Sequence, residues 1–464
     1  MKNMNKRKFY LSLILFSLLG QVAWVVENMY FNVFISEEFS ASATDVALMV
    51  SLSAIVATFT TLFIGSLSDK VGKRKLFIWL GYIAWGLSIC AFALFSVESL
   101  SKIAGSTTAA CALGIGLTIS GDCLMTLFGS TANDAAFNAW LTDSTDSTNR
   151  GKIEGINSMM PLIAILVVFG LLSSFAKSGS WWILYLIIGG LTIIAGIIGI
   201  FTIQESTVVV NKDEHYFKRI IYGFKPSSIK KNKVLYLTYL AFAIFGIAIQ
   251  IFMTYLIAYL KVYVPGTTLG FDTYVLVMAP AIIAAAVATF FYGRLYDKLH
   301  FKKSIIPSLL VLLVGLILLS FTFLTNNIVL IFIGMLFLLS GYLCSTAIFN
   351  AKMRDLTPVD KVGSFQGIKM FAQVLLPMLV GPWIGAAAIS GDFAYNIENV
   401  LVPDSYAYTP NPAIFIASAI VIALVFVSLI FLFISDKTCY FLKKDNDKDL
   451  EDYNEEAANS NTDN

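Results

Sequence analysis

Two acidic residues, Glu27 and Asp122, lie in long apolar stretches where no Lys, Arg or His falls at a comparable depth. A carboxylate near the centre of a bilayer costs about 2.5–3.5 kcal/mol on insertion scales unless it is neutralised. Two acids without a base must bind a proton or a cation, or keep one carboxyl group protonated. These residue types therefore predict a site that exchanges a proton or a cation. Two structural alternatives stay open: Asp122 could only hydrogen-bond a neighbouring helix, and Glu27 could be hydrated near the outer rim.

A third acid, Asp134, lies closer to the end of the same apolar stretch as Asp122. It stands beside Asn133 and Asn138. We expect it to join a loop network with Asp143 and Arg150, and so to have a structural role.

A polar stripe follows one face of the first apolar stretch, and similar side chains occur in later stretches. The stripe residues are spaced by three and four positions, and a polar face toward lipid would be costly, so it must meet protein or water. Amide groups beside aromatic rings suit a polyhydroxylated ligand such as a sugar or glycoside, although a chain with 14% aromatic residues would offer such combinations in any case. The predicted substrate-binding residues are Gln21, Trp24, Asn28, Asn32, Gln250, Tyr255, Gln373 and Trp383.

The elements that position these residues are membrane spans. Of the residues 57% are hydrophobic and 13% charged, too few polar side chains to cover a soluble protein of this length. The apolar stretches approach the roughly 20 residues that cross a bilayer as a helix. We predict an all-α polytopic protein with twelve spans near 9–35, 44–67, 76–97, 111–141, 152–176, 181–203, 234–261, 271–293, 304–324, 328–350, 363–389 and 412–434. The first span is too long for a signal peptide, and no small-residue cleavage site follows it.

The placement of basic residues predicts the orientation of the chain. Of 32 Lys and Arg residues, all but Lys102, Lys177 and Lys261 fall on one side if the spans alternate. The positive-inside rule then places both termini in the cytoplasm of a plasma (inner) membrane protein. In this topology the spans of Glu27 and Asp122 run in opposite directions, and at about 1.5 Å per residue the two acids reach similar depths.

The chain contains two halves with matching segments. The coincidences fall at one constant offset: Asn138/Asn350, Ala139/Ala351, Asp143/Asp355, Thr145/Thr357, Gly151/Gly363, Gly155/Gly367 and Ile156/Ile368. Both copies lie between the fourth and fifth span of a half. We predict six-helix bundles over 1–203 and 234–435, a cytoplasmic central loop over 204–233 and a disordered tail over 436–464.

A second repeated segment lies between the second and third span of each half. Segment 65–75 (GSLSDKVGKRK) resembles the signature loop of the major facilitator superfamily, and 293–303 (GRLYDKLHFKK) is a degenerate copy with His300 in place of the second Gly. The resemblance implies twelve spans in two halves, with the first and fourth spans lining a central cavity. It also implies that these loops hold one half against the other when the cytoplasmic side is closed. The predicted gating residues are Gly65, Asp69, Gly72, Arg74, Gly293 and Asp297.

Segment 138–156 is also similar to loops of the glycoside–pentoside–hexuronide cation symporters and of sucrose-transporter-like facilitators. Melibiose-type members of the former carry paired acids inside the second span, where this chain has only Asp45 at the external end. Their sodium site therefore does not carry over, and a proton becomes the expected coupling ion, with sodium the alternative.

Together these features predict a proton-coupled secondary transporter of a small polar solute, a sugar or glycoside, that works by alternating access. Two alternatives stay open: proton-driven efflux of amphipathic compounds, and a receptor or scaffold that transports nothing. A membrane-embedded enzyme is disfavoured because no intramembrane His, metal cluster or nucleophile–base motif occurs. The expected partners are the solute, the coupling ion and the lipid bilayer, and we expect no cofactor, no metal and no nucleic acid.

Overall fold

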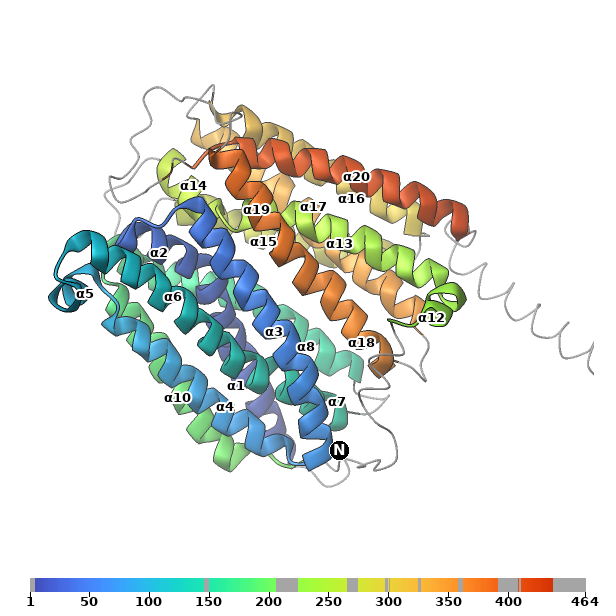
Figure 1. Ribbon diagram of the computed structural model, residues 1–464. Helices are drawn as coiled ribbons and strands as arrows, with labels where there is room; N and C mark the ends of the chain where they lie inside the picture. The colour runs from blue at the N-terminus through green and yellow to red at the C-terminus, as the bar shows by residue number, and fades with distance from the viewer. Residues whose placement is uncertain are drawn as a thin grey trace, which may run out of the picture.

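The computed structural model describes residues 5–145, 150–205, 224–264, 274–296, 299, 301–323, 327–357, 362–390, 408 and 410–436. Every regular element in these ranges is helical (Figure 1). Eleven helices are long and apolar enough to cross a membrane, and α15 (Tyr274–Tyr296) contributes a shorter apolar helix over Tyr274–Thr289. The predicted all-α fold of twelve spans is confirmed. Most of the predicted central loop and the predicted disordered tail lie outside the described residues.

The first half runs from α1 to α10, and several of its spans contain a π-helical or 3-10 turn. Its elements are α1 (Lys6–Val25), η1 (Val26–Phe31), α2 (Asn32–Phe39), α3 (Ala43–Val71), α4 (Arg74–Ala91), η2 (Phe92–Leu94), α5 (Val97–Ala104), α6 (Thr107–Gly129), η3 (Ser130–Phe137), α7 (Asn138–Asp143), α8 (Arg150–Val167), η4 (Val168–Leu172), α9 (Ser173–Lys177) and α10 (Trp181–Thr202).

The second half begins with a short helix that precedes its first span. Its elements are α12 (Pro226–Lys231), α13 (Lys233–Met253), α14 (Leu256–Tyr263), α15, α16 (Phe301–Ser320), η5 (Phe321–Phe323), α17 (Ile328–Leu356), α18 (Val362–Met370), η7 (Phe371–Leu375), α19 (Leu376–Ser390) and α20 (Ala413–Ser435).

Local sequence signals begin and end several of these helices. The Asn5 side chain accepts hydrogen bonds from backbone N–H groups at the start of α1, and Ser42 with Asp45 forms a capping box at the start of α3. Gly72 ends α3 in the left-handed conformation, with φ +69°. Such signals satisfy the backbone groups that the first and last turns of a helix leave without partners.

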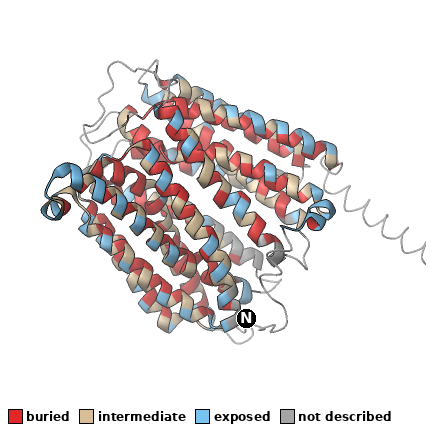
Figure 2. Ribbon diagram, viewed as in Figure 1, coloured by how far each residue is buried: buried red, intermediate tan, exposed pale blue. Residues whose placement is uncertain are grey.

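Glycines let neighbouring spans approach closely inside each half. A Cβ atom on Gly86 of α4 would lie 2.6 Å from the carbonyl oxygen of Gly189 of α10, and one on Gly315 of α16 would overlap the backbone of Leu338 of α17. Helices in lipid gain no hydrophobic free energy from association, so they depend on the close van der Waals packing that small residues allow. Outward-facing apolar residues are exposed instead, for example Leu80 at 51%. Exposed positions follow the outer faces of the helices in Figure 2.

The two halves meet along α3 and α19, which lie side by side in the centre of Figure 1. Ser51 of α3 receives a hydrogen bond from the indole of Trp383 of α19 at 2.9 Å and itself lies 3.3 Å from the carbonyl oxygen of Met378. Further contacts between the halves gather where α2 and α14 meet, at the end of the bundle opposite α7 and α12.

Candidate functional site

The structure brings Glu27 and Asp122 together inside the first half. Glu27 lies in η1 and is 6% exposed, and Asp122 lies on α6 and is 2% exposed. The Thr126 hydroxyl, one helical turn after Asp122, donates to Glu27 Oε1 at 2.9 Å. Ser53 of α3 lies within hydrogen-bonding reach of Asp122. Three spans therefore converge on the acid pair.

The remaining oxygens of the pair have no donor. Glu27 Oε2, Asp122 Oδ1 and the nearby Thr118 hydroxyl lack a hydrogen-bond partner among the residues that the structure describes. A buried polar atom without a partner costs roughly 1–3 kcal/mol, and more when it is charged. A proton on one carboxyl group lowers this cost because it removes a charge and supplies a donor. The described residues contain no cluster of three or more His, Cys, Asp or Glu that could hold a metal ion.

A π-helical turn places Glu27. The first span changes from α-helix to π-helix over η1 and returns to α-helix at Asn32. Such a turn accommodates an extra residue and changes the direction of the side chains that follow, and π-helical turns occur frequently at functional sites. The fourth span contains a similar turn, η3, which begins four residues after Thr126.

Asp134 belongs to a second polar cluster, and its described hydrogen bonds differ from the expected network with Asp143 and Arg150. Asp134 accepts hydrogen bonds from Ser130 at 3.1 Å and Asn133 at 3.4 Å, and the Trp24 indole lies within reach. Asp134 therefore finds its donors on its own span and on α1. Asp143 pairs with Arg74, in the loop between the second and third spans. The Arg150 side chain lies outside the described residues.

The polar stripe of the first span is used mainly for packing and for contact between the halves. Trp24 packs on Trp85 with ring centroids 4.9 Å apart. Asn32 is buried and donates to the carbonyl oxygen of Thr254 in the second half at 3.1 Å. Asn28 is exposed and donates to its own helix, and Gln21 is half-buried.

Of the predicted binding residues of the second half, some hydrogen-bond to other helices and others have exposed side chains. Tyr255 is buried, with its hydroxyl 2.9 Å from the carbonyl oxygens of both Ala43 and Pro382. Gln250 is half-buried, while Gln373 in η7 and Trp383 are exposed. Of the predicted substrate-binding set, Asn28 and Gln373 are thus polar side chains that this conformation leaves accessible.

An ion pair that the sequence analysis missed joins the halves. Lys261 Nζ of α14 lies 2.5 Å from Glu37 Oε1 of α2, and both side chains are largely buried. Tyr30 and Tyr274 share a hydrogen bond at 2.9 Å in the same region. The sequence held one signal for this contact, since Lys261 is one of three basic residues that depart from the charge asymmetry.

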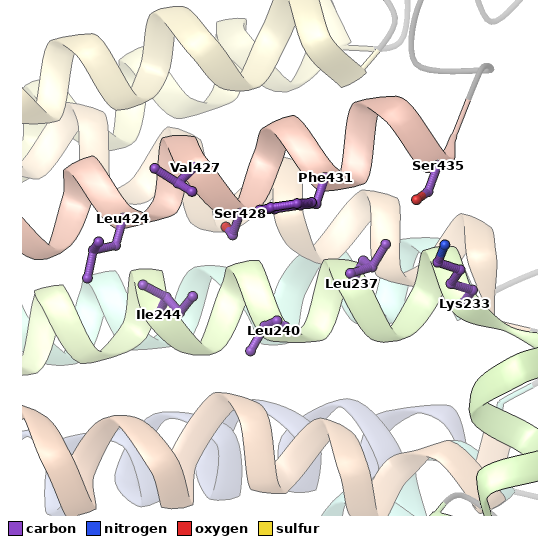
Figure 3. A pocket seen from close by; sticks show the side chains of 9 residues that line it. All are labelled: Lys233, Leu237, Leu240, Ile244, Leu424, Val427, Ser428, Phe431 and Ser435. Atoms are coloured by element: carbon purple, nitrogen blue, oxygen red, sulfur yellow. The ribbon is translucent and has the colours of Figure 1, made fainter.

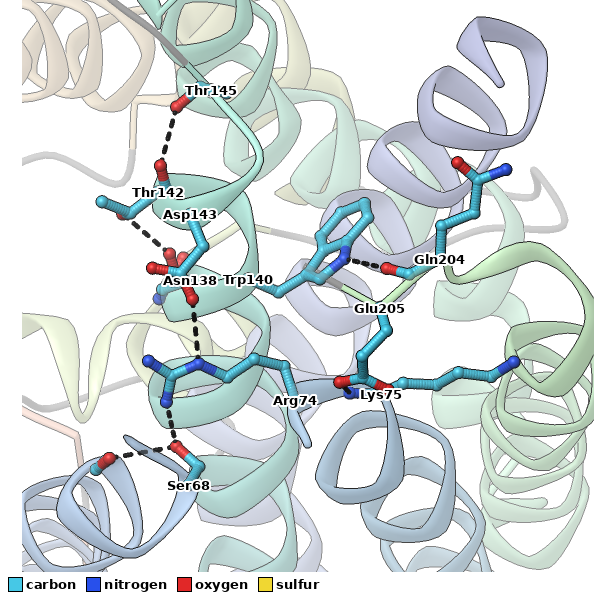
Figure 4. A network of polar contacts seen from close by, with 11 residues as sticks. Ser68, Arg74, Lys75, Asn138, Trp140, Thr142, Asp143, Thr145, Gln204 and Glu205 are labelled. Carbon is cyan, nitrogen blue, oxygen red and sulfur yellow. Dashed lines mark hydrogen bonds and ion pairs between the residues drawn. The ribbon is translucent and has the colours of Figure 1, made fainter. Parts of the chain in front are cut away.

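The first signature loop is tied to the repeated segment of its own half (Figure 4). Arg74 is buried, its Nε donates to Asp143 at 3.0 Å, and its Nη1 donates to Ser68. Gly72 donates its backbone N–H to the Ser68 carbonyl oxygen at 2.9 Å. The side chain of Asp69, and the position of Asp297, lie outside the described residues. Gly65 and Gly293 lie within α3 and α15.

Equivalent positions of the two repeated segments contact the chain shortly after the last span of each half. Trp140 Nε1 donates to the Gln204 carbonyl oxygen at 2.8 Å, just after α10. Lys352, at the matching position of the second copy, pairs with Asp436 at 2.6 Å, just after α20. The two contacts lie at equivalent places in the two halves although their chemistry differs, and this supports the internal repeat.

Comparisons with known proteins decide the family. The family model described as Major Facilitator Superfamily matches residues 10–382. This chain belongs to the major facilitator superfamily. No curated protein sequence gives a significant match.

Solved structures share the superfamily fold at low sequence identity. A bacterial homolog of the human lysosomal transporter Spinster, inward-facing and unoccupied, aligns with a TM-score of 0.65 and 15% identity over 94% of this chain and 98% of that chain. The nucleoside transporter NupG aligns with a TM-score of 0.61 and 15% identity over 91% of this chain and 98% of that one. As a member of the superfamily this chain is a multi-pass membrane transporter of small solutes and not an enzyme.

Proposed function

We propose that this transporter moves a small polar solute, a sugar or glycoside, across the plasma membrane by alternating access, and that it is driven by protons. The observation that carries the proposal is the buried pair Glu27 and Asp122, whose Oε2 and Oδ1 atoms lack partners in the described part of the chain. No ion pair of either acid with a Lys, Arg or His is present among the described residues. Such a pair needs a proton to be stable in an apolar bundle.

In this proposal Glu27 carries the proton and Asp122 is its partner. Protonation of Glu27 lowers the charge of the pair between η1, α3 and α6 from two to one and supplies a hydrogen-bond donor, which makes the buried position less costly. Deprotonation requires water or a cation to reach the pair, so it couples to a conformation that opens this region. That linkage between protonation and conformation is what ion-driven transport requires.

The nature of the solute rests on the accessible amides. Asn28 and Gln373 can exchange hydrogen bonds with hydroxyl groups of a sugar or glycoside. The structural neighbour NupG is described as a nucleoside transporter, and a nucleoside also carries a polyhydroxylated ring. A panel of candidate solutes should therefore include sugars, glycosides and nucleosides.

The test is concentrative uptake by the purified protein in proteoliposomes. With an imposed proton gradient, a radiolabelled member of the panel should accumulate, and a protonophore should abolish the accumulation. A sodium gradient should not replace the proton gradient. Counterflow without accumulation under either gradient would refute coupling, and expulsion of amphipathic dyes without uptake of any panel member would favour the efflux alternative.

We also propose that both termini are cytoplasmic, because the basic residues concentrate at the end of the bundle where α12 and the start of α1 lie. A cysteine introduced at position 225 should react with an impermeant maleimide only after cells are opened. Reaction in intact cells would reverse the orientation.

A further inference from the structure

An apolar groove runs along the outer surface between α13 and α20 (Figure 3). We call it the α13/α20 groove, and its volume is about 480 Å³. Its walls are Leu237, Leu240 and Ile244 of α13 and Leu424, Val427 and Phe431 of α20. Leu240, Leu424 and Phe431 are more than half exposed. The groove therefore faces the hydrocarbon of the membrane and not the centre of the bundle.

The length of the groove matches one leaflet. From Lys233 to Ile244 the α13 backbone rises about 16 Å at roughly 1.5 Å per residue. Half of a hydrocarbon core about 30 Å thick is about 15 Å. An acyl chain lying in the groove would thus extend from the headgroup region to about the middle of the bilayer.

The mouth of the groove is basic. Lys233 and Ser435 lie at the same end of the groove in Figure 3. Lys230 and Lys231 lie in the last turn of α12, which directly precedes Lys233 in the chain. All three lysines are exposed, and their ammonium groups make no ion pair with the described residues. Asp436, which follows Ser435, pairs with Lys352 at 2.6 Å. Within the described part of the chain, the mouth therefore carries three positive charges without a paired acid.

A second groove on the other side of α20 provides the contrast. It has a volume of about 350 Å³ and includes Lys302 of α16 at the same end of the bundle. The Lys302 ammonium, however, lies 5.4 Å from the centre of the Phe433 ring, in a cation–π contact. A free ammonium group at the mouth distinguishes the α13/α20 groove from its neighbour.

We propose that the α13/α20 groove binds an anionic phospholipid, with one acyl chain along the groove and the headgroup phosphate at Lys233. Lys230 and Lys231 add to the attraction because basic clusters beside a membrane span favour anionic headgroups. The apolar walls provide the contact area, and the lysines provide the selectivity for charge.

The test compares bound lipids by native mass spectrometry. Wild-type protein is freed of lipid and placed in micelles with equal amounts of phosphatidylglycerol and phosphatidylcholine of identical acyl chains. The first bound lipid should be mainly phosphatidylglycerol. Lys233→Gln should reduce this preference about fivefold, the factor that corresponds to about 1 kcal/mol for one lysine near an anionic surface. Adding Lys230→Gln and Lys231→Gln should reduce it further.

Two matched variants separate this site from general lipid binding. Lys6→Gln removes an exposed lysine of the first half at the same end of the bundle, and it should keep the preference. Leu240→Trp fills the groove and should reduce binding of both lipids, whereas Leu80→Trp, at an equally exposed position on α4, should not.

Three results would overturn the proposal. The first is an unchanged preference in the Lys233→Gln variant. The second is an equal loss of bound lipid in the Leu240→Trp and Leu80→Trp variants. The third is a wild-type dimer that Leu240→Trp converts to a monomer without any change in bound lipid, because a second copy of the chain would then occupy the groove.

Discussion

At the scale of single residues, the buried carboxyl groups of Glu27 and Asp122 need a proton to offset the cost of their burial. Glu27 receives one hydrogen bond from Thr126, and Asp122 has Ser53 within reach, so each acid has one oxygen satisfied and one left over. The hydroxyl groups stabilise the carboxylates only in part. A residue that keeps the shape but cannot ionise therefore tests the role of the charge.

Glu27→Gln should abolish accumulation of solute against its gradient while exchange across the membrane persists. The glutamine keeps the hydrogen bond from Thr126 but can neither release nor bind the coupling proton. The measurement is proton-driven uptake and counterflow in the same proteoliposomes. Asp122→Asn should do the same, or shift the pH dependence of uptake if Asp122 only tunes Glu27.

Glu98→Gln is the control for these two variants, since Glu98 is an exposed acid that pairs with Lys102. It should leave both assays unchanged. Full accumulation by the Glu27→Gln variant would mean that the acid is structural and that coupling occurs elsewhere.

At the scale of elements, short repeated segments hold the ends of spans together. In the signature loop, α3 ends at Gly72. Arg74 at the start of α4 then donates a hydrogen bond to Asp143 at the end of α7. The loop between the second and third spans is thereby fixed to the loop between the fourth and fifth. An arginine suits this position because its planar group donates to two acceptors at once.

The Arg74–Asp143 contact should contribute about 1–3 kcal/mol, because Arg74 is buried and a hydrogen bond to a charged group is stronger than a neutral one. Thermal unfolding of the Arg74→Gln, Asp143→Asn and double variants measures this coupling. The double variant should be little less stable than Arg74→Gln alone.

The exposed pair Glu98 and Lys102, at 3.2 Å, is the matched control, and its coupling should be below about 1 kcal/mol. Strictly additive losses in the Arg74 and Asp143 variants would show that the contact does not stabilise the loop. A slower rate of uptake in Arg74→Gln at equal expression would further support a gating role.

At the scale of the whole molecule, the described contacts between the halves close the end formed by α2 and α14. The Glu37–Lys261 pair, the Tyr30–Tyr274 hydrogen bond and the Asn32 contact to Thr254 all lie there. Alternating access would require these contacts to break in the conformation that opens this end. Their strength therefore sets the population of that conformation.

Lys261→Gln should raise the population of the conformation in which this end is open. The reporter is Ser36→Cys, a nearly isosteric change at a fully buried position of α2, in a protein without its native cysteines. Its reaction with an impermeant maleimide should become roughly tenfold faster with Lys261→Gln, which corresponds to about 1.4 kcal/mol. Lys102→Gln should leave the rate unchanged. If Ser36→Cys reacts at the same rate with and without Lys261→Gln, the Glu37–Lys261 ion pair does not help to close this end.

The sequence by itself determined the class of this protein, its spans and its repeat. A bilayer imposes a length and an apolar composition on every crossing helix, so hydropathy locates the spans without knowledge of their neighbours. The Gly and Asp positions of segment 65–75 and the constant offset between Asp143 and Asp355 carried the family resemblance. The similar depth of Glu27 and Asp122 also followed from helix rise alone.

Only the tertiary structure decided which side chains meet. Contacts between spans depend on how each helix is rotated about its axis, and π-helical turns such as η1 change that rotation in the middle of a span. Thr126, one turn from Asp122, could have been inferred as a partner on α6, but Ser53 on α3 could not.

The contacts between the halves were equally hidden, since Glu37 and Lys261 are far apart in the chain and meet only when the bundles pack. Tyr255 and Trp383, which the sequence predicts to bind the solute, hydrogen-bond across the interface in this conformation. In an apolar membrane chain almost every polar side chain must find a partner, and packing alone selects whether that partner is a solute or another helix.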